Sequence, residues 1–109
     1  MESILVSIKK LLGIPDDYAH FDQDIIIQIN SAFSILNQLG VGPEEGFAID
    51  DSSATWSEFI GEDPSLNLVK TFVQIKVKLA FDPPTSGTLM DSYNRQLDEL
   101  TWRLSITNN

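Results

Sequence analysis

Apolar residues recur at intervals of three and four along most of the chain, which is the spacing of an amphipathic α-helix. Near the N-terminus this pattern predicts a helix over about Glu2–Leu12, which Gly13 ends. A second helix is predicted over Gln23–Leu39, with Asp22 as its N-cap. Ile27 lies off the apolar stripe of that second helix, which indicates a helix covered on more than one side.

The third predicted helix starts at Asp63-Pro64, where Asp is a suitable N-cap and Pro suits the first helical position, and it runs to about Phe81. The apolar residues of this helix form two faces. The helix ends at Asp82-Pro83-Pro84, because proline lacks a backbone N–H and disfavours helical geometry in the residue before it. The two prolines predict a stiff corner, after which a helix over Thr88–Ile106 has a narrow, heptad-like apolar seam.

The segment 41–54, between the second and third helices, has no helical pattern. Its Phe47–Ile49 part suits either a short strand or an extended piece that is tied down. Thr55 and Glu58 have the spacing of a capping box, which predicts one short helical turn through Trp56–Ile60. We therefore expect an all-α fold, a small bundle of about four helices with a long irregular loop, in a single domain over residues 1–109.

The charge of the chain is acidic and uneven. The net charge is −9, from 16 acidic and seven basic residues, and the stretch Leu11–Val69 contains no lysine or arginine. A basic surface for phosphates is therefore not expected, which argues against tight binding to DNA or RNA. In the simpler interpretation, the acidic residues keep the loops solvated. In the more specific interpretation, they prevent a surface that lies near nucleic acid from binding it, because like charges repel.

Cysteine is absent, which excludes disulfides and thiol catalysis. The N-terminal lysines follow the apolar residues and no small-residue cleavage pattern is present, so the segment is a poor signal peptide. No apolar run approaches the roughly 20 residues that span a bilayer. We expect a cytosolic protein with no membrane association.

Residues that could carry chemistry are present but are not arranged for it. His20 lies near Asp16 and Asp17 in a loop, which is a weak basis for a metal site. Asp50-Asp51 and Glu44-Glu45 are adjacent pairs, a geometry that favours solvated acids over an acid–base pair. We therefore predict no enzymatic activity, no cofactor and no metal site.

The aromatic residues and the proline corner are the candidates for partner contact. Anchoring of a core or a loop is the simpler interpretation of the aromatic rings, and the alternative is an interface, where tryptophan and phenylalanine concentrate. We predict contacts with a partner or with other copies of the chain at six positions: Phe47, Trp56, Phe59, Pro83, Pro84 and Trp102.

Several segments together resemble a known family. The most specific are Gln38–Gly42, Thr55-Trp56 and Phe81–Pro84, within a resemblance that runs over about Ile4–Leu104. The chain resembles the head–tail connector, or adaptor, proteins of long-tailed phages and prophages, which are also described as DNA-packaging proteins. That family has no catalytic motif to carry over to this sequence.

The resemblance implies a structural virion protein that is assembled in the host cytoplasm. It implies a ring of subunits between the portal protein and a tail-side connector or stopper protein, with DNA passing nearby without sequence-specific binding. A ring subunit needs two different contact surfaces, and the two apolar faces of the third helix suit this need. The alternative is a small acidic helical module or regulator that binds a basic protein surface through the acids of Leu11–Val69.

Overall fold

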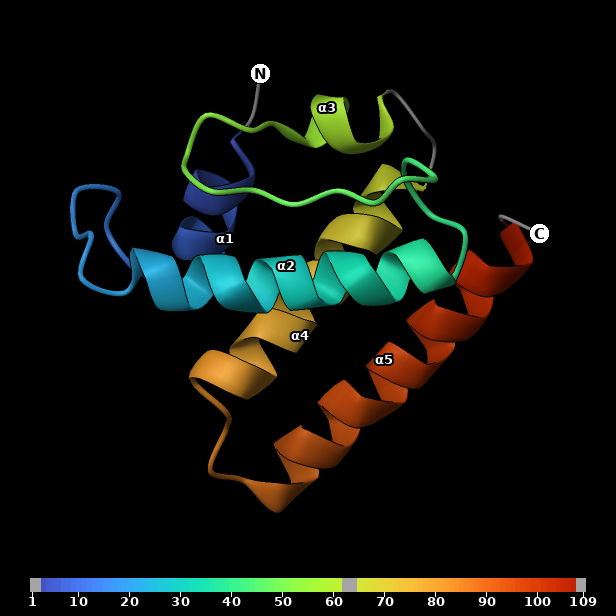
Figure 1. Cartoon of the computed structure of the whole chain (residues 1–109). Coiled ribbons are helices and arrows are strands. Elements are labelled where there is room, and N and C mark those ends of the chain that lie inside the picture. The colour runs from blue at the N-terminus through green and yellow to red at the C-terminus, as the bar shows by residue number, and fades with distance from the viewer. Residues whose placement is uncertain (1–2, 62–64, 108–109) are drawn as a thin grey trace.

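Five α-helices make up the fold within residues 3–61 and 65–107, which are the residues that the computed structural model describes (Figure 1). In this part of the chain the only β-type pairing is an isolated antiparallel bridge between Ser3 and Thr55. The predicted all-α fold is confirmed, and the predicted short turn is a helix in its own right. The helices are α1 (Ile4–Leu11), α2 (Asp22–Gln38), α3 (Trp56–Ile60), α4 (Leu66–Phe81) and α5 (Gly87–Thr107).

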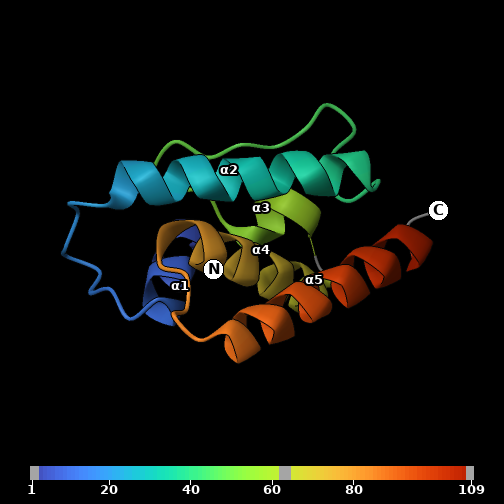
Figure 2. The ribbon, with the colours of Figure 1, turned by 90° about the horizontal axis from the view of Figure 1, so that it is seen from below.

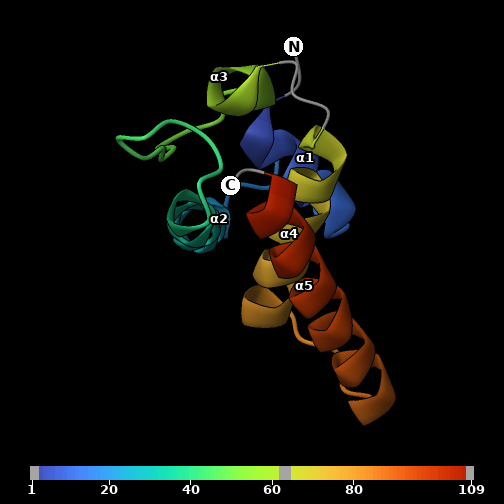
Figure 3. The ribbon, with the colours of Figure 1, turned by 90° about the vertical axis from the view of Figure 1, so that its right-hand side faces the viewer.

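The helices form two layers. α2 and the 41–54 loop lie on one side, and α1, α4 and α5 lie on the other (Figures 2 and 3). α4 packs against both α2 and α5, and α1 packs against α2. The result is a flattened molecule with extents of 37 × 35 × 19 Å.

The core lies where the apolar stripes of the helices meet. The predicted stripe of α2 is buried, as is most of the main face of α4, and the α5 seam reaches the same core through its last three leucines. Burial of each such side chain stabilises the fold by about 1.5–3 kcal/mol relative to exposure. The deepest members are Ile4, Ile8, Ile25, Ile29, Phe33, Leu36, Val69, Phe72, Val73, Val77 and Leu104.

Two of the three predicted helix-capping motifs lie in the described residues. The prediction of Asp22 as N-cap is wrong, because Phe21 takes that position without a side-chain hydrogen bond and Asp22 is the first helical residue. The capping box is confirmed, since the Thr55 hydroxyl accepts from the Glu58 backbone N–H and the Glu58 carboxylate accepts from the Thr55 N–H. The predicted start at Asp63-Pro64 falls outside the described residues.

The 41–54 loop runs back along the outer side of α2 (Figures 1 and 2) and is tied to it. Asn30 on α2 substitutes for a neighbouring strand, since its amide oxygen accepts from Ile49 N at 2.8 Å and its Nδ2 donates to Ile49 O at 2.9 Å. Asn37 Nδ2 donates to Pro43 O at 2.9 Å. Of the two structures predicted for this part of the loop, the tied-down extended piece is therefore the one formed.

Gly42 lies close to the ring of the core residue Phe59. Its φ is +85°, and a Cβ placed on it lies 2.5 Å from Cε1 of Phe59. We expect Gly42→Ala to lower the free energy of unfolding by about 2–5 kcal/mol, since a left-handed alanine costs about 1–2 kcal/mol and overpacking adds about 1–3 kcal/mol. Urea denaturation measures this change.

Gly46 provides the matched control, because its φ is +91° but nothing lies within 4 Å of an added Cβ. Gly46→Ala should therefore show the backbone cost alone, about 1–2 kcal/mol. Equal losses for the two variants would mean that Phe59 does not pack against Gly42 as described.

Candidate functional site

Three of the predicted contact residues meet in one aromatic cluster. Phe47 from the loop and Trp56 and Phe59 from α3 surround Phe33 of α2, with ring centroids 5.5, 6.3 and 4.5 Å from that of Phe33. Trp56 and Phe59 are buried and Phe47 is partly buried. The cluster joins the loop and α3 to α2, which gives these rings a structural role in the isolated chain. Partner contact by them stays a prediction.

Trp56 also joins α3 to α1. Its Nε1 donates a buried hydrogen bond of 2.8 Å to the Ser7 hydroxyl, which in turn donates to Ile4 O. The Lys70 ammonium lies 5.8 Å from the centroid of the indole ring, within range of a cation–π attraction. One edge of the indole lines a hollow of about 270 Å³ beside Leu11, which is exposed although it belongs to the apolar pattern of α1.

Lys9 fixes the loop between α1 and α2. Its side chain is 2% exposed, and its ammonium donates to the backbone oxygens of Asp16 at 3.1 Å and Tyr18 at 2.8 Å. The same nitrogen lies 2.8 Å from Oδ1 of Asp22, a buried oxygen that accepts no hydrogen bond among the described residues. This electrostatic contact balances the Asp22 charge and positions the acidic 13–21 loop against the start of α2.

The proline corner joins α4 to α5. Asp82 has φ −147° and ψ 69°, outside the helical region, and its backbone N–H donates to Lys78 O. Its carboxylate pairs with the Lys78 ammonium at 2.9 Å. Pro83 is exposed and Pro84 is partly buried. The conformation of the corner is therefore fixed by contacts between residues that are near in sequence. Its outer surface remains available to a partner.

Replacement of both corner prolines by alanine tests this arrangement. We expect Pro83→Ala/Pro84→Ala to lower the free energy of unfolding by only about 1–2 kcal/mol, because each proline acts mainly by restricting the unfolded chain. Assembly into oligomers should weaken more than folding, since α5 then leaves the core at a variable angle. Sedimentation velocity and urea denaturation measure the two effects. Pro15→Ala is the control in an exposed loop, and normal assembly of the double variant would reduce the corner to a helix stop.

A groove runs between α2 and the α4–α5 pair. It consists of two hollows of about 360 and 310 Å³, and Gln28 and Ala80 line both of them. We call this the α2–α4 groove. Ile27, on its rim, is 60% exposed, so the cover predicted for this side of α2 is not supplied by the described residues. The remaining apolar side chains of the walls are Phe21, Ala32, Ile35, Leu79, Phe81 and Leu97.

Trp102 is the most exposed of the large hydrophobic residues described, at 65%. It lies off the α5 seam, as predicted, and beside Arg103, which pairs with Glu99 at 3.1 Å. Trp102 and Pro83 are thus the predicted contact residues that are exposed in the isolated chain, whereas Pro84 and Phe47 are partly buried. The groove was missed in the sequence, where only the off-stripe position of Ile27 pointed to it.

The titratable residues singled out in the sequence lie apart. The His20 ring packs edge-on against Phe21, with centroids 4.8 Å apart. The hydroxyl and then the backbone N–H of Ser53 donate hydrogen bonds to Asp51, which lowers the pKa of this exposed carboxyl from its ordinary value. Residues 3–61 and 65–107 contain no group of three or more His, Cys, Asp or Glu side chains that could hold a metal ion.

Across the described helices, none combines the length and the apolar character needed to cross a membrane.

Comparison with known proteins gives one finding. Residues 4–109 match the family described as phage connector protein. No curated protein and no solved structure matches the chain. The match covers nearly all of the sequence, including the loop, the corner and α5, and it confirms the resemblance drawn from the sequence. The chain therefore belongs to the phage connector protein family.

Proposed function

We propose that this protein is a structural virion component that forms a ring-shaped adaptor between the phage portal and tail-side proteins, around the DNA channel. Membership of the phage connector family carries the proposal, because the match extends over residues 4–109. A phage structural or assembly role follows from that family. In the proposal the protein acts during DNA packaging and head completion, by binding and not by catalysis.

The surface chemistry supports a subunit that contacts different neighbours on different sides. Head-to-tail contacts in a ring join two unlike surfaces, whereas an isologous dimer uses one surface twice. The chain offers an exposed tryptophan on α5 and a groove of mixed polar and apolar lining beside α2. Neither is covered by the described residues, and together they supply two unlike surfaces.

The charge supports a position near DNA. With a net charge of −9, the protein does not compete with counterions for the phosphates, so a channel wall of this composition lets DNA slide. We therefore predict that the protein shows negligible binding to duplex DNA at physiological salt. A virion location, after assembly in the host cytoplasm, is part of the same proposal.

The alternative function, an acidic module that binds a basic protein surface, makes different predictions from the ring adaptor and can be tested separately. The stretch Leu11–Val69, which has no basic residue, favours a module that binds a basic protein surface in place of nucleic acid. Such a module stays monomeric or dimeric and competes with DNA for its partner. The ring adaptor instead forms closed oligomers and does not compete with DNA.

The deciding experiment measures assembly with and without the portal protein of the same phage. Purified protein is analysed by native mass spectrometry and electron microscopy over a range of concentrations, alone and after mixing with portal rings. The proposal predicts closed rings or portal-bound rings. A protein that neither oligomerises nor binds the portal under these conditions would rule the proposal out.

A further inference from the structure

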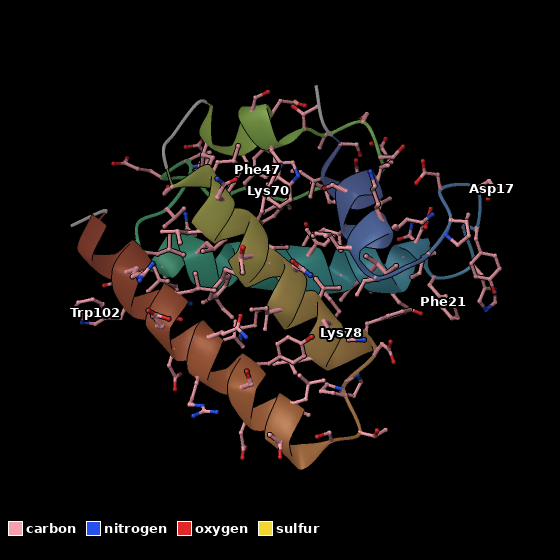
Figure 4. The ribbon with its side chains drawn as sticks, turned by 180° about the vertical axis from the view of Figure 1, so that it is seen from behind. Asp17, Phe21, Phe47, Lys70, Lys78 and Trp102 are labelled. Carbon is pink, nitrogen blue, oxygen red and sulfur yellow. The ribbon has the colours of Figure 1, made fainter. Side chains whose placement is uncertain are left out.

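The larger hollow of the α2–α4 groove combines aromatic, aliphatic and acidic side chains. It has a volume of about 360 Å³ and is lined by residues from the start of α2 and the end of α4: Phe21, Asp24, Ile27, Gln28, Ala80 and Phe81. Ile27 is 60% exposed there, although an isoleucine gains free energy by leaving water. Figure 4 shows Phe21 at the end of the molecule opposite to Trp102. We call this surface the Phe21 hollow.

Two phenylalanine rings form the aromatic part of the Phe21 hollow. The rings of Phe21 and Phe81 meet edge to face, with centroids 5.1 Å apart and an interplanar angle of 74°. Phe21 also packs against the rings of Tyr18 and His20, at 5.8 and 4.8 Å. Both phenylalanines are partly buried against the core, so the rings are held in place before a partner binds. The face of such a ring attracts a cation.

The acidic side chains around the Phe21 hollow are open to solvent. Asp24, which lines it, is exposed and lies in no ion pair with another described residue. Asp16 and Asp17 are also exposed, in the 13–21 loop that ends at Phe21. The surface at this end of the molecule therefore carries negative charge beside its aromatic rings.

The lysines of this region do not cancel that charge. Lys78 of α4 pairs with Asp82 at 2.9 Å. The ammonium of Lys9 is buried against Asp22, at 2.8 Å. Lys76 lines the second hollow of the groove and not the Phe21 hollow. A basic group from outside the chain is thus needed to balance Asp24.

We propose that the Phe21 hollow receives an arginine side chain from a basic segment of a neighbouring virion protein. The guanidinium stacks on the phenylalanine rings and donates hydrogen bonds to the Asp24 carboxylate, while Ile27 contacts the methylene stem. This inference rests on the proposed function, which supplies the neighbouring protein, and it names the surface and the side chain through which the adaptor binds that protein.

Arginine suits this mixture of surfaces better than other occupants. Its guanidinium is planar, stacks on aromatic rings and pairs with carboxylates in a fork, whereas the lysine ammonium is a more strongly hydrated point charge. A purely apolar side chain would remove water from Asp24 without replacing its hydrogen bonds. DNA carries the same sign of charge as this surface and is repelled.

The charge of the whole chain favours the same kind of partner. A net charge of −9 attracts a basic segment before contact, and this attraction is screened over about 10 Å at moderate salt. We therefore expect the affinity for the partner to fall as salt is raised.

Two variants that remove one carboxylate each test the site. Asp24→Asn changes the Phe21 hollow, and Asp98→Asn changes an exposed position of α5, so both alter the net charge equally. Surface plasmon resonance measures binding to portal rings and to the tail-side protein of the same phage. Asp24→Asn should bind one of these proteins about tenfold more weakly than the unmodified chain, and Asp98→Asn should bind as the unmodified chain does. Equal affinities for the two variants would overturn the inference.

Two substitutions of Ile27 test the sign of the occupant's charge. Ile27→Lys places an ammonium beside Asp24, which repels a guanidinium, and should weaken binding by about tenfold or more. Ile27→Glu places a carboxylate at the same exposed position and should weaken binding far less, because the added charge attracts the arginine. An apolar occupant would be rejected equally by both variants, and that result would contradict the proposal.

Labelled peptides test the preference for arginine directly. Fluorescence anisotropy compares a hexapeptide of arginine with a hexapeptide of lysine, which have the same charge. The unmodified chain should bind the arginine peptide several-fold more tightly, since only the guanidinium stacks on the rings, and Asp24→Asn should lose most of this preference. Equal binding of the two peptides by the unmodified chain would exclude an arginine site.

Failure of this site and failure of the ring adaptor give different results. If Asp24→Asn and Ile27→Lys form rings and bind both neighbours as the unmodified chain does, the arginine site is wrong and the ring adaptor stands. If these variants lose ring formation but keep binding to the neighbours, the occupant is a second copy and the inference is overturned. If the unmodified chain prefers the arginine peptide but neither oligomerises nor binds portal, the ring adaptor fails and the arginine site stands.

Discussion

Replacement of Lys9 by methionine should lower the free energy of unfolding by about 3–5 kcal/mol, the largest loss we expect from a single change of charge. Methionine has a similar length and is readily accommodated in a core, so packing is largely kept. The loss comes from the ammonium, which the carboxylate of Asp22 and the backbone oxygens of Asp16 and Tyr18 share. Without it, a buried carboxylate oxygen has no balancing charge.

Urea denaturation of three variants separates this explanation from a general effect of charge. Lys10→Met, at the exposed neighbouring position, should change the free energy of unfolding by less than about 0.5 kcal/mol. Lys9→Met/Asp22→Leu should recover much of the loss, because replacing both members of a buried pair is far less costly than removing one. Similar midpoints for Lys9→Met and Lys10→Met would show that the ammonium is not buried in this pair.

Replacement of Trp56 by alanine should cost about 3–5 kcal/mol, the usual range for loss of a buried tryptophan. Trp56 is 3% exposed and contacts the aromatic cluster, and its indole N–H is the donor to Ser7. Trp56→Phe keeps most of the apolar contact and loses this hydrogen bond, so its cost should be about 1–2 kcal/mol. The ratio of the two losses separates packing from hydrogen bonding.

Trp102 is the matched control for Trp56 because the chain has two tryptophans, one buried and one exposed. Trp102→Ala should change the stability of the monomer by less than about 0.5 kcal/mol. Trp102→Phe leaves Trp56 as the single tryptophan, whose emission should be blue-shifted until the protein unfolds. A red-shifted emission from the native Trp102→Phe variant would contradict the burial of Trp56.

The helices could be predicted from the sequence because their signals are local. The spacing of apolar residues correctly predicted α2 and the seam of α5. The spacing of Thr55 and Glu58 correctly predicted α3 and its capping box. The prolines gave the end of α4. Each of these signals depends on residues fewer than about seven positions apart, where helix geometry alone fixes which side chains meet.

The contacts that position the loops could not be predicted, because their partners are distant in sequence. Lys9 at the end of a helix suits the helix dipole equally well whether it is exposed or buried. Asp22 has the right type for an N-cap, but its carboxylate contacts Lys9 instead. Asn30 gives no sign in the sequence that it pairs with Ile49, and an aromatic ring such as Trp56 suits a core or an interface alike.

In the candidate site, too, local features could be read from the sequence and features that join distant segments could not. The position of Trp102 off the α5 seam can be read from the sequence, whereas its exposure comes from the structure, because a tryptophan suits a core or an interface alike. The groove needs α2, α4 and α5 placed side by side, which no local pattern specifies. The groove therefore became visible only in the structure, where helices distant in sequence are placed together.

The mass of the native assembly tests the central claim most directly. Native mass spectrometry of the purified protein, alone and mixed with portal rings from the same phage, counts the subunits in each species. The ring adaptor predicts one dominant closed oligomer with a fixed number of subunits, either free or bound to portal. Monomers or dimers alone, at every concentration and in the presence of portal, would contradict it.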